Sequence, residues 1–155
     1  MMSSVRVQTE DFDVSAEMLT LRKRNPKIGA VASFIGVVRD LNDGDSVSTL
    51  TLEHYPGMTE KSLEAIVQQA KERWDIYDAL IVHRVGTMRP LDQIVLVIVT
   101  SAHRGESFQA CEFLMDYLKT RAPFWKKEVE LSKTLTSHLG FGLKNFEQIH
   151  PMYEV

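Results

Sequence analysis

The chain has 155 residues, of which 44% are hydrophobic and 25% are charged, and this predicts one globular domain, residues 1–155, with its own core. The formal net charge of −3 argues against a nucleic-acid partner, because a basic excess is needed to bind a phosphate backbone. No apolar run approaches the ~20 residues that cross a bilayer, and no signal segment opens the chain. We therefore expect a cytoplasmic protein without a membrane partner.

The first half of the chain predicts short strands that alternate with amphipathic helices. The expected elements are strands over residues 5–7, 28–38 and 48–55 and helices over 15–24 and 59–74. Ser15 and Thr59 are typical N-caps for the two helices. Small residues in the second strand indicate close approach of another backbone, and they are Gly29, Ala30, Ala32, Ser33 and Gly36. Residues 40–45 are rich in Asp, Asn and Gly and predict a turn, so we expect the strands on either side to pair as a hairpin.

The second half is organised around a strand, a loop and a helix. Residues 79–85 and 94–99 predict two buried strands, separated by a loop over 86–92. A helix follows and ends before Pro123. Its apolar stripe predicts one buried face and consists of Phe108, Cys111, Leu114, Met115 and Leu118. Cys111 is interpreted as a core residue rather than a catalytic thiol, and a lone cysteine excludes both a disulfide framework and a thiolate zinc site.

Helices in this pattern are flanked by paired strands and do not alternate strictly with single ones. The chain therefore predicts an α+β domain with a mixed, largely antiparallel sheet rather than a Rossmann-type fold. Beyond residue 128 the pattern weakens, and two glycines interrupt a helical stretch over 131–143.

Positive charges gather where the predicted elements end, which is unexpected in an acidic chain. Arg39 ends the strand over 28–38, and His103 and Arg104 follow the strand over 94–99. The two latter residues start a helix, where free N–H groups attract anions. The alternative is structural: His103 caps the helix, Arg104 pairs with a surface acid, and Arg39 is a solvated hairpin residue.

A second group of cations crowds the end of the same helix. Lys119 lies at the rim of the apolar stripe, close to Arg121 and Lys126. Like charges and partial burial disfavour its charged form, so it can exchange a proton or attack an acyl group near neutral pH. The alternative is a solvated helix end, where cations are favoured anyway. Together the two groups predict an anion-binding pocket, lined by Arg39, His103, Arg104, Lys119 and Lys126.

No further motif specifies a reaction. The histidines His54, His83 and His103 are scattered without metal-ligand spacing, and the chain has neither a glycine-rich phosphate loop nor a nucleophile elbow. Phe124 and Trp125 are interpreted as packing anchors. The residues alone therefore predict an anion site without a metal and leave the chemistry open.

Four longer segments carry more information. They read LTLEHYPGMTEKSL (residues 50–63), VHRVG (82–86), VTSAHR (99–104) and MDYLKTRAPFWKKE (115–128). In this order they closely resemble the large, catalytic subunit of molybdopterin synthase, over about residues 28–128. The resemblance implies an α/β hammerhead fold. The tail over 129–155 diverges, because it lacks the C-terminal strand that is usual in the family.

The resemblance also implies a reaction. The family converts cyclic pyranopterin monophosphate into the dithiolene molybdopterin and needs no tightly bound cofactor. Sulfur arrives as a thiocarboxylate on the C-terminal glycine of a small ubiquitin-like sulfur-carrier subunit. The large subunit is typically a homodimer with one small subunit at each end, a heterotetramer.

By the same resemblance, Lys119 and Lys126 are the expected catalytic residues. The expected substrate-binding residues are Phe34, Val37, Val38, Arg39, His103, Arg104, Met115, Lys119, Lys126, Lys127 and Glu128. Two alternatives stay open: a non-catalytic member that binds the pterin or the partner, and a phosphate-ester hydrolase that uses His103. Turnover with a thiocarboxylated partner distinguishes the catalytic subunit from the non-catalytic member. Phosphate release without the partner favours the hydrolase.

Overall fold

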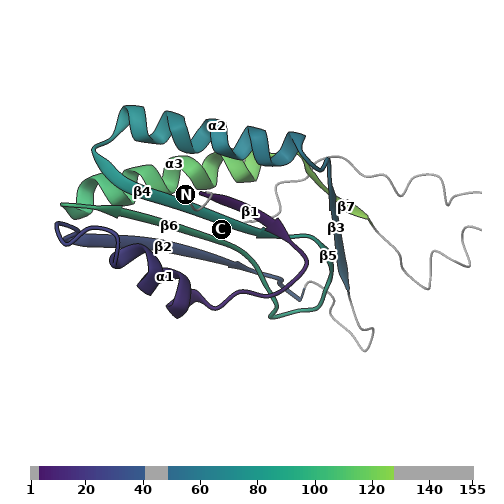
Figure 1. The fold of residues 1–155 in the computed structure, drawn as a ribbon. Coiled ribbons are helices and arrows are strands. Elements are labelled where there is room, and N and C mark those ends of the chain that lie inside the picture. The colour runs from purple at the N-terminus through teal and green to yellow at the C-terminus, as the bar shows by residue number, and fades with distance from the viewer. Residues whose placement is uncertain (1–3, 41–48, 128–155) are drawn as a thin grey trace, which may run out of the picture.

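The computed structural model describes residues 4–40 and 49–127, which form three helices and two β-sheets (Figure 1). In chain order the elements are β1 (Val5–Gln8), α1 (Val14–Arg22), β2 (Ala30–Val37), β3 (Leu50–His54), α2 (Met58–Arg73), β4 (Ile76–Arg84), β5 (Gly86–Met88), β6 (Gln93–Ser101), α3 (Arg104–Thr120) and β7 (Phe124–Lys127). The α+β class with a mixed, largely antiparallel sheet is confirmed.

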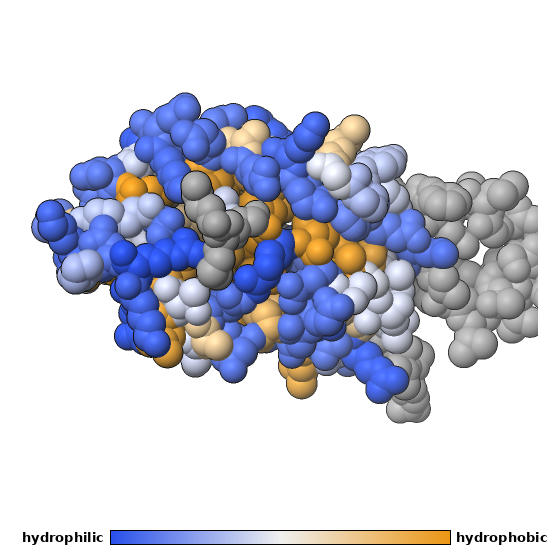
Figure 2. Space-filling model, viewed as in Figure 1, coloured by the Kyte–Doolittle hydropathy of each residue, from blue (hydrophilic) through white to orange (hydrophobic). Residues whose placement is uncertain are grey.

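The main sheet has the strand order β1-β4-β6-β2. Only β1 and β4 are parallel, and β6 pairs antiparallel with both of its neighbours. Helices α2 and α3 cover one face and α1 covers the other (Figure 1). Every residue of β6 after Gln93 is buried, as expected for the central strand of a sheet covered on both faces. In Figure 2 the helices present hydrophilic side chains and apolar residues lie between them.

A small sheet, of order β5-β3-β7, lies at the end of the main sheet where β2 finishes (Figure 1). Two expectations are wrong here. The strands on either side of residues 40–45 do not form a hairpin, because β2 pairs with β6 whereas β3 pairs with β5 and β7. Residues 86–92 are not all loop, because β5 lies within them. Both errors concern long-range pairing, which a local turn signal does not determine.

The helix starts also differ from the expected caps. The carboxylate of Asp13, not Ser15, caps α1 by accepting a hydrogen bond from the Ala16 N–H at 3.1 Å. Helix α2 follows Gly57, whose N–H donates to the Glu60 carboxylate at 3.1 Å. Thr59 is instead buried within the first turn. Both helices thus begin close to the expected positions with different capping groups.

The apolar stripe of α3 is shifted from its expected position. Phe108 is 63% exposed, and Ser107 and Ala110 lie on the buried face in its place. Cys111 is buried as expected, and burial raises the pKa of its thiol to about 11, with a smaller contribution from the charge of Glu112. Cys111 is therefore a protonated core residue at neutral pH.

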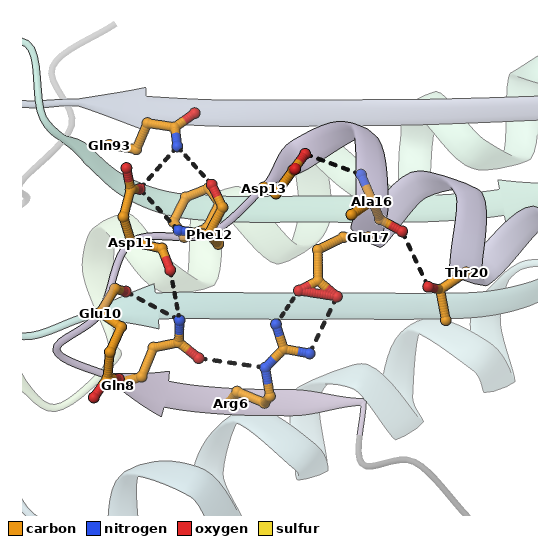
Figure 3. A network of polar contacts seen from close by, with 10 residues as sticks. All are labelled: Arg6, Gln8, Glu10, Asp11, Phe12, Asp13, Ala16, Glu17, Thr20 and Gln93. Atoms are coloured by element: carbon orange, nitrogen blue, oxygen red, sulfur yellow. Dashed lines mark hydrogen bonds and ion pairs between the residues drawn. The ribbon is translucent and has the colours of Figure 1, made fainter.

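The connection from β1 to α1 is tied to the main sheet by a polar network (Figure 3). Arg6 pairs with Glu17 of α1, and the Gln93 amide donates to the Asp11 carboxylate at 2.9 Å and to the Phe12 carbonyl at 3.0 Å. The hydrogen bond from Gln93 is the main reason why the pKa of Asp11 is lowered. This network positions buried Phe12 under the sheet.

Candidate anion-binding site

The main sheet separates the first group of predicted cations. In the pairing of β2 with β6, Ala30 lies opposite Ser101 and Val37 lies opposite Gln93. Arg39 therefore lies near the start of β6, whereas His103 and Arg104 follow its end. The nine residues of β6 span roughly 30 Å. Within one chain these residues therefore do not line one pocket, contrary to the simplest form of the prediction.

Helix α3 brings Lys119 back to the end where Arg39 lies. The helix starts at Arg104 and packs along β6 and β2 for 17 residues, a length of roughly 25 Å. Its last turn lies beside the small sheet, to which β7 belongs (Figure 1). We call the residues Arg39, Lys119 and Lys126 the lysine end, and His103 with Arg104 the histidine end.

Strand β7 separates two adjacent lysines onto opposite faces. Lys126 lies opposite Leu52, on the face that also carries Phe124, and Leu52 and Phe124 are each 1% exposed. Lys126 thus leaves the strand on its core-facing side and is half-buried. Lys127 points to the other side, where its Nζ lies 3.9 Å from the Glu53 carboxylate. An exposed pair of this kind contributes about 1 kcal/mol or less.

Lys119 is half-buried on α3, one turn after Met115. Met115 is partly buried against the core cluster and lies four residues before Lys119 on the same helix, so an apolar side chain neighbours Lys119. Phe34 of β2 is partly buried against the same cluster. Within residues 4–40 and 49–127, neither Lys119 nor Lys126 forms an ion pair with a carboxylate. Two partly desolvated positive charges that have no carboxylate partner in this part of the chain favour binding of an anion.

The valines expected at this end differ in exposure. Val38 is 6% exposed and belongs to the core, and its N–H donates to the Asp92 carbonyl at 2.9 Å. Val37 is 41% exposed and lies on β2, which is an edge strand of the main sheet. Arg39 is exposed and follows directly. The expected site residue Glu128 and the tail over 129–155 lie outside the described residues.

The histidine end is held by a close backbone contact. A Cβ atom on Gly29 would come within 2.3 Å of the Ala102 carbonyl oxygen, so the expected close approach at Gly29 is confirmed. His103 occupies the N-cap position of α3 without a side-chain capping bond, and His103 and Arg104 are both exposed. Their side chains and the free N–H groups of the helix start therefore face solvent together, an arrangement that attracts anions.

Sequence reasoning missed the importance of His83. This residue is completely buried on β4, and its ring stacks on Phe124 with the centroids 3.7 Å apart and the planes at 13°. Burial lowers the pKa of His83 to about 3, partly offset by its hydrogen bond to the Arg84 carbonyl. The available signal was its spacing, because Ala79, Ile81 and His83 alternate on one face of the strand.

Within 4–40 and 49–127, no helix is long and apolar enough to cross a membrane. In the same ranges, no group of three His, Cys, Asp or Glu side chains is placed to hold a metal ion.

The fold and the cations at its two ends define an α+β domain of a kind known from other proteins. The family model for the MoaE protein matches residues 7–121. A molybdopterin synthase catalytic subunit from Ralstonia nicotianae is 66% identical over 127 residues, which are 82% of this chain and 72% of that protein. The chain therefore belongs to the MoaE family, and the resemblance to molybdopterin synthase catalytic subunits is confirmed.

Solved structures agree with this assignment. Molybdopterin cofactor biosynthesis protein E from Burkholderia multivorans has a TM-score of 0.77 and 65% identity, covering 84% of this chain and 89% of that one. A complex of subunits 1 and 2 of molybdopterin-converting factor from Helicobacter pylori matches with a TM-score of 0.68 and 18% identity, over 80% and 83% of the two chains. The latter similarity shows the shared fold alone.

Proposed function

We propose that this chain transfers sulfur from the thiocarboxylated C-terminus of a small ubiquitin-like partner to cyclic pyranopterin monophosphate. Each of two transfers forms a carbon–sulfur bond on the substrate while a carbon–oxygen bond breaks. Water then cleaves the bond between that sulfur and the partner's acyl carbon. The partner leaves with an ordinary carboxylate, and the sulfur stays on the substrate as one half of the dithiolene.

The observation that carries this proposal is the lysine end. Substrate phosphate and thiocarboxylate are both anions, and half-buried Lys119 and Lys126 offer positive charge without a carboxylate partner among the described residues. Such groups stabilise the negative charge that develops as a carbon–oxygen bond breaks. The apolar side chain of Met115, one helical turn before Lys119, favours an environment of low water content, in which this stabilisation is stronger.

The separation of the two ends supports a homodimer. Strand β2 is an edge of the main sheet, and Ile35 and Val37 on it are 36% and 41% exposed. If β2 pairs antiparallel with β2 of a second copy, the start of one strand lies beside the finish of the other. The histidine end of each copy then lies beside the lysine end of the other. Two copies would thus assemble the pocket that one chain lacks.

The partner is expected to reach this pocket with a flexible tail. A carboxylate-ended or thiocarboxylate-ended peptide complements the charge of Lys119 and Lys126, while the folded body of the partner docks outside the pocket. With one partner for each pocket, the assembly would be a heterotetramer.

The test combines the purified chain, thiocarboxylated small subunit and cyclic pyranopterin monophosphate, and it measures dithiolene formation. We expect turnover with the intact partner, and no sulfur transfer with only moderately weaker binding when the partner's terminal Gly-Gly is deleted. Binding of the pterin or the partner without turnover would instead favour a non-catalytic family member. Phosphate release without the partner would indicate a hydrolase.

A further inference from the structure

We infer that His83 is a positioning residue for Lys126, acting through the ring of Phe124. This inference rests on the proposed function in one respect, namely that Lys126 takes part in sulfur transfer. His83 does not contact the substrate in this proposal. It belongs to the main sheet, whereas Lys126 belongs to the small sheet.

Strand β7 needs such an anchor because it is short and marginal. It has four residues and, among the described strands, pairs only with β3. A two-stranded contact of this length contributes little stability by itself. Its one fully buried side chain is Phe124, at 1% exposure. Trp125 and Lys127 also contact Glu53, but these contacts join β7 only to β3. The position of β7 against the main sheet therefore depends on what Phe124 packs against.

The Phe124 ring lies near two histidine rings. The His83 ring lies 3.7 Å from the Phe124 ring, centroid to centroid and nearly parallel, and the His54 ring lies 6.1 Å away at 30°. The His83 contact is the only ring contact of Phe124 with the main sheet among the described residues. It joins the small sheet to β4, a strand in the interior of the main sheet.

His83 itself is fixed. Its side chain is buried, and its Nδ1 lies 2.8 Å from the Arg84 carbonyl oxygen, which orients the imidazole as a donor toward that oxygen. The ring is uncharged at neutral pH, as its lowered pKa requires. A neutral ring with one locked orientation gives Phe124 a flat surface to stack on.

Displacement of Phe124 is transmitted to Lys126. The two residues lie two positions apart in an extended strand and thus on the same face. They oppose His54 and Leu52 in the pairing with β3. If the His83–Phe124 contact is lost, β7 shifts or opens, and the Lys126 amine moves with it. A misplacement of about 1 Å in an active site can cost about 10²-fold in rate.

The first experiment measures amide hydrogen exchange in the full chain. His83→Asn keeps a donor for the Arg84 carbonyl but removes the ring, whereas His83→Phe keeps the ring. We expect exchange over residues 124–127 to become at least about tenfold faster in His83→Asn and to stay slow in His83→Phe, with β6 unchanged in both. Unchanged exchange over 124–127 in His83→Asn, or equally fast exchange in His83→Phe, would overturn the inference. If His83→Asn does not fold, exchange over residues 124–127 is measured in Phe124→Leu instead, and we expect it to be faster than in the unmodified chain.

The second experiment measures dithiolene formation in the same variants. His83→Asn should lower kcat about tenfold or more with the KM for the partner unchanged, and His83→Phe should restore it. Leu80→Ala is the matched control, because Leu80 lies on the same strand but in the cluster under α1, and it should lose stability without losing kcat. A similar loss of kcat in Leu80→Ala would overturn the positioning role. Absence of turnover in the unmodified chain would instead refute the proposed function, and the exchange result would still decide whether His83 anchors β7.

Discussion

At the scale of single residues, adjacent side chains of the same type have different surroundings. Lys126 and Lys127 are neighbours, yet one leaves β7 on its core-facing side and the other pairs with Glu53 on the opposite side. His103 is exposed, whereas His83 is fully buried. Residue type alone therefore does not identify the chemistry, and burial and register must be known as well.

Lys119 is the residue for which we expect the largest effect on turnover. Lys119→Ala removes both the amine and one positive charge, and Lys119→Arg keeps the charge but removes the titratable group. If Lys119 transfers a proton or captures the acyl group, both variants should lose at least ~10²-fold in single-turnover sulfur transfer. Recovery of much of the rate by arginine would show that the charge alone matters, and a near-normal rate in Lys119→Ala would remove Lys119 from the mechanism.

His83 should make the stability of the protein depend on pH. Its pKa is about 3 in the folded chain against 6.5 as the ordinary value, so as the pH falls the unfolded chain takes up the proton first. The contribution of His83 to the free energy of unfolding is fully present above about pH 6.5, and it is lost progressively as the pH falls toward 3. Between pH 7 and 5 this residue should cost about 2 kcal/mol of unfolding free energy. Urea unfolding at both pH values tests this. Between pH 7 and 5 the unfolding free energy of His83→Phe should fall by about 2 kcal/mol less than that of the unmodified chain. An equal decline in both proteins would contradict the assignment.

At the scale of elements, local pattern was a good guide to helices and buried strands and a poor guide to pairing. The apolar run of β6 and the stripe of α2 are where the sequence predicts them, because burial of a periodic face is a local property of the chain. The hairpin between β2 and β3 was wrong, because a turn-rich segment does not reveal that both strands have better partners elsewhere. The Asp13 cap was missed for a simpler reason, since Asp13 and Ser15 are both good caps.

Gly29 shows how an element junction supports the histidine end. In Gly29→Ala the new Cβ would meet the Ala102 carbonyl oxygen at 2.3 Å, and a backbone atom cannot move away cheaply. We expect a loss of about 1–3 kcal/mol in unfolding free energy. Gly105→Ala is the control: nothing lies within 4 Å of its Cβ, and alanine favours a helix, so stability should rise by roughly 0.5–1 kcal/mol. Thermal unfolding of both variants measures the difference, and an equally stable Gly29→Ala would contradict the close approach.

At the scale of the whole molecule, the chemistry of the predicted site stays a prediction, and its geometry within one chain differs from the simplest expectation. The cations lie at the ends of strands and helices, as expected, but Arg39 and Arg104 lie at opposite ends of the main sheet. Sequence reasoning could not detect this, because the antiparallel course of β2, β6 and α3 was not known. A second copy paired along β2 would bring the two ends together, and the proposed sulfur transfer would then require two chains rather than one.

Dithiolene formation by a mixed dimer tests this account most directly. Lys119→Ala and Arg104→Ala chains carrying different tags are co-expressed, and the mixed dimer is purified through both tags. Each variant alone should be nearly inactive, whereas the mixed dimer contains one intact pocket and should show about half of the unmodified turnover per dimer. A mixed dimer as inactive as either variant alone would contradict a pocket built from the lysine end of one copy and the histidine end of the other.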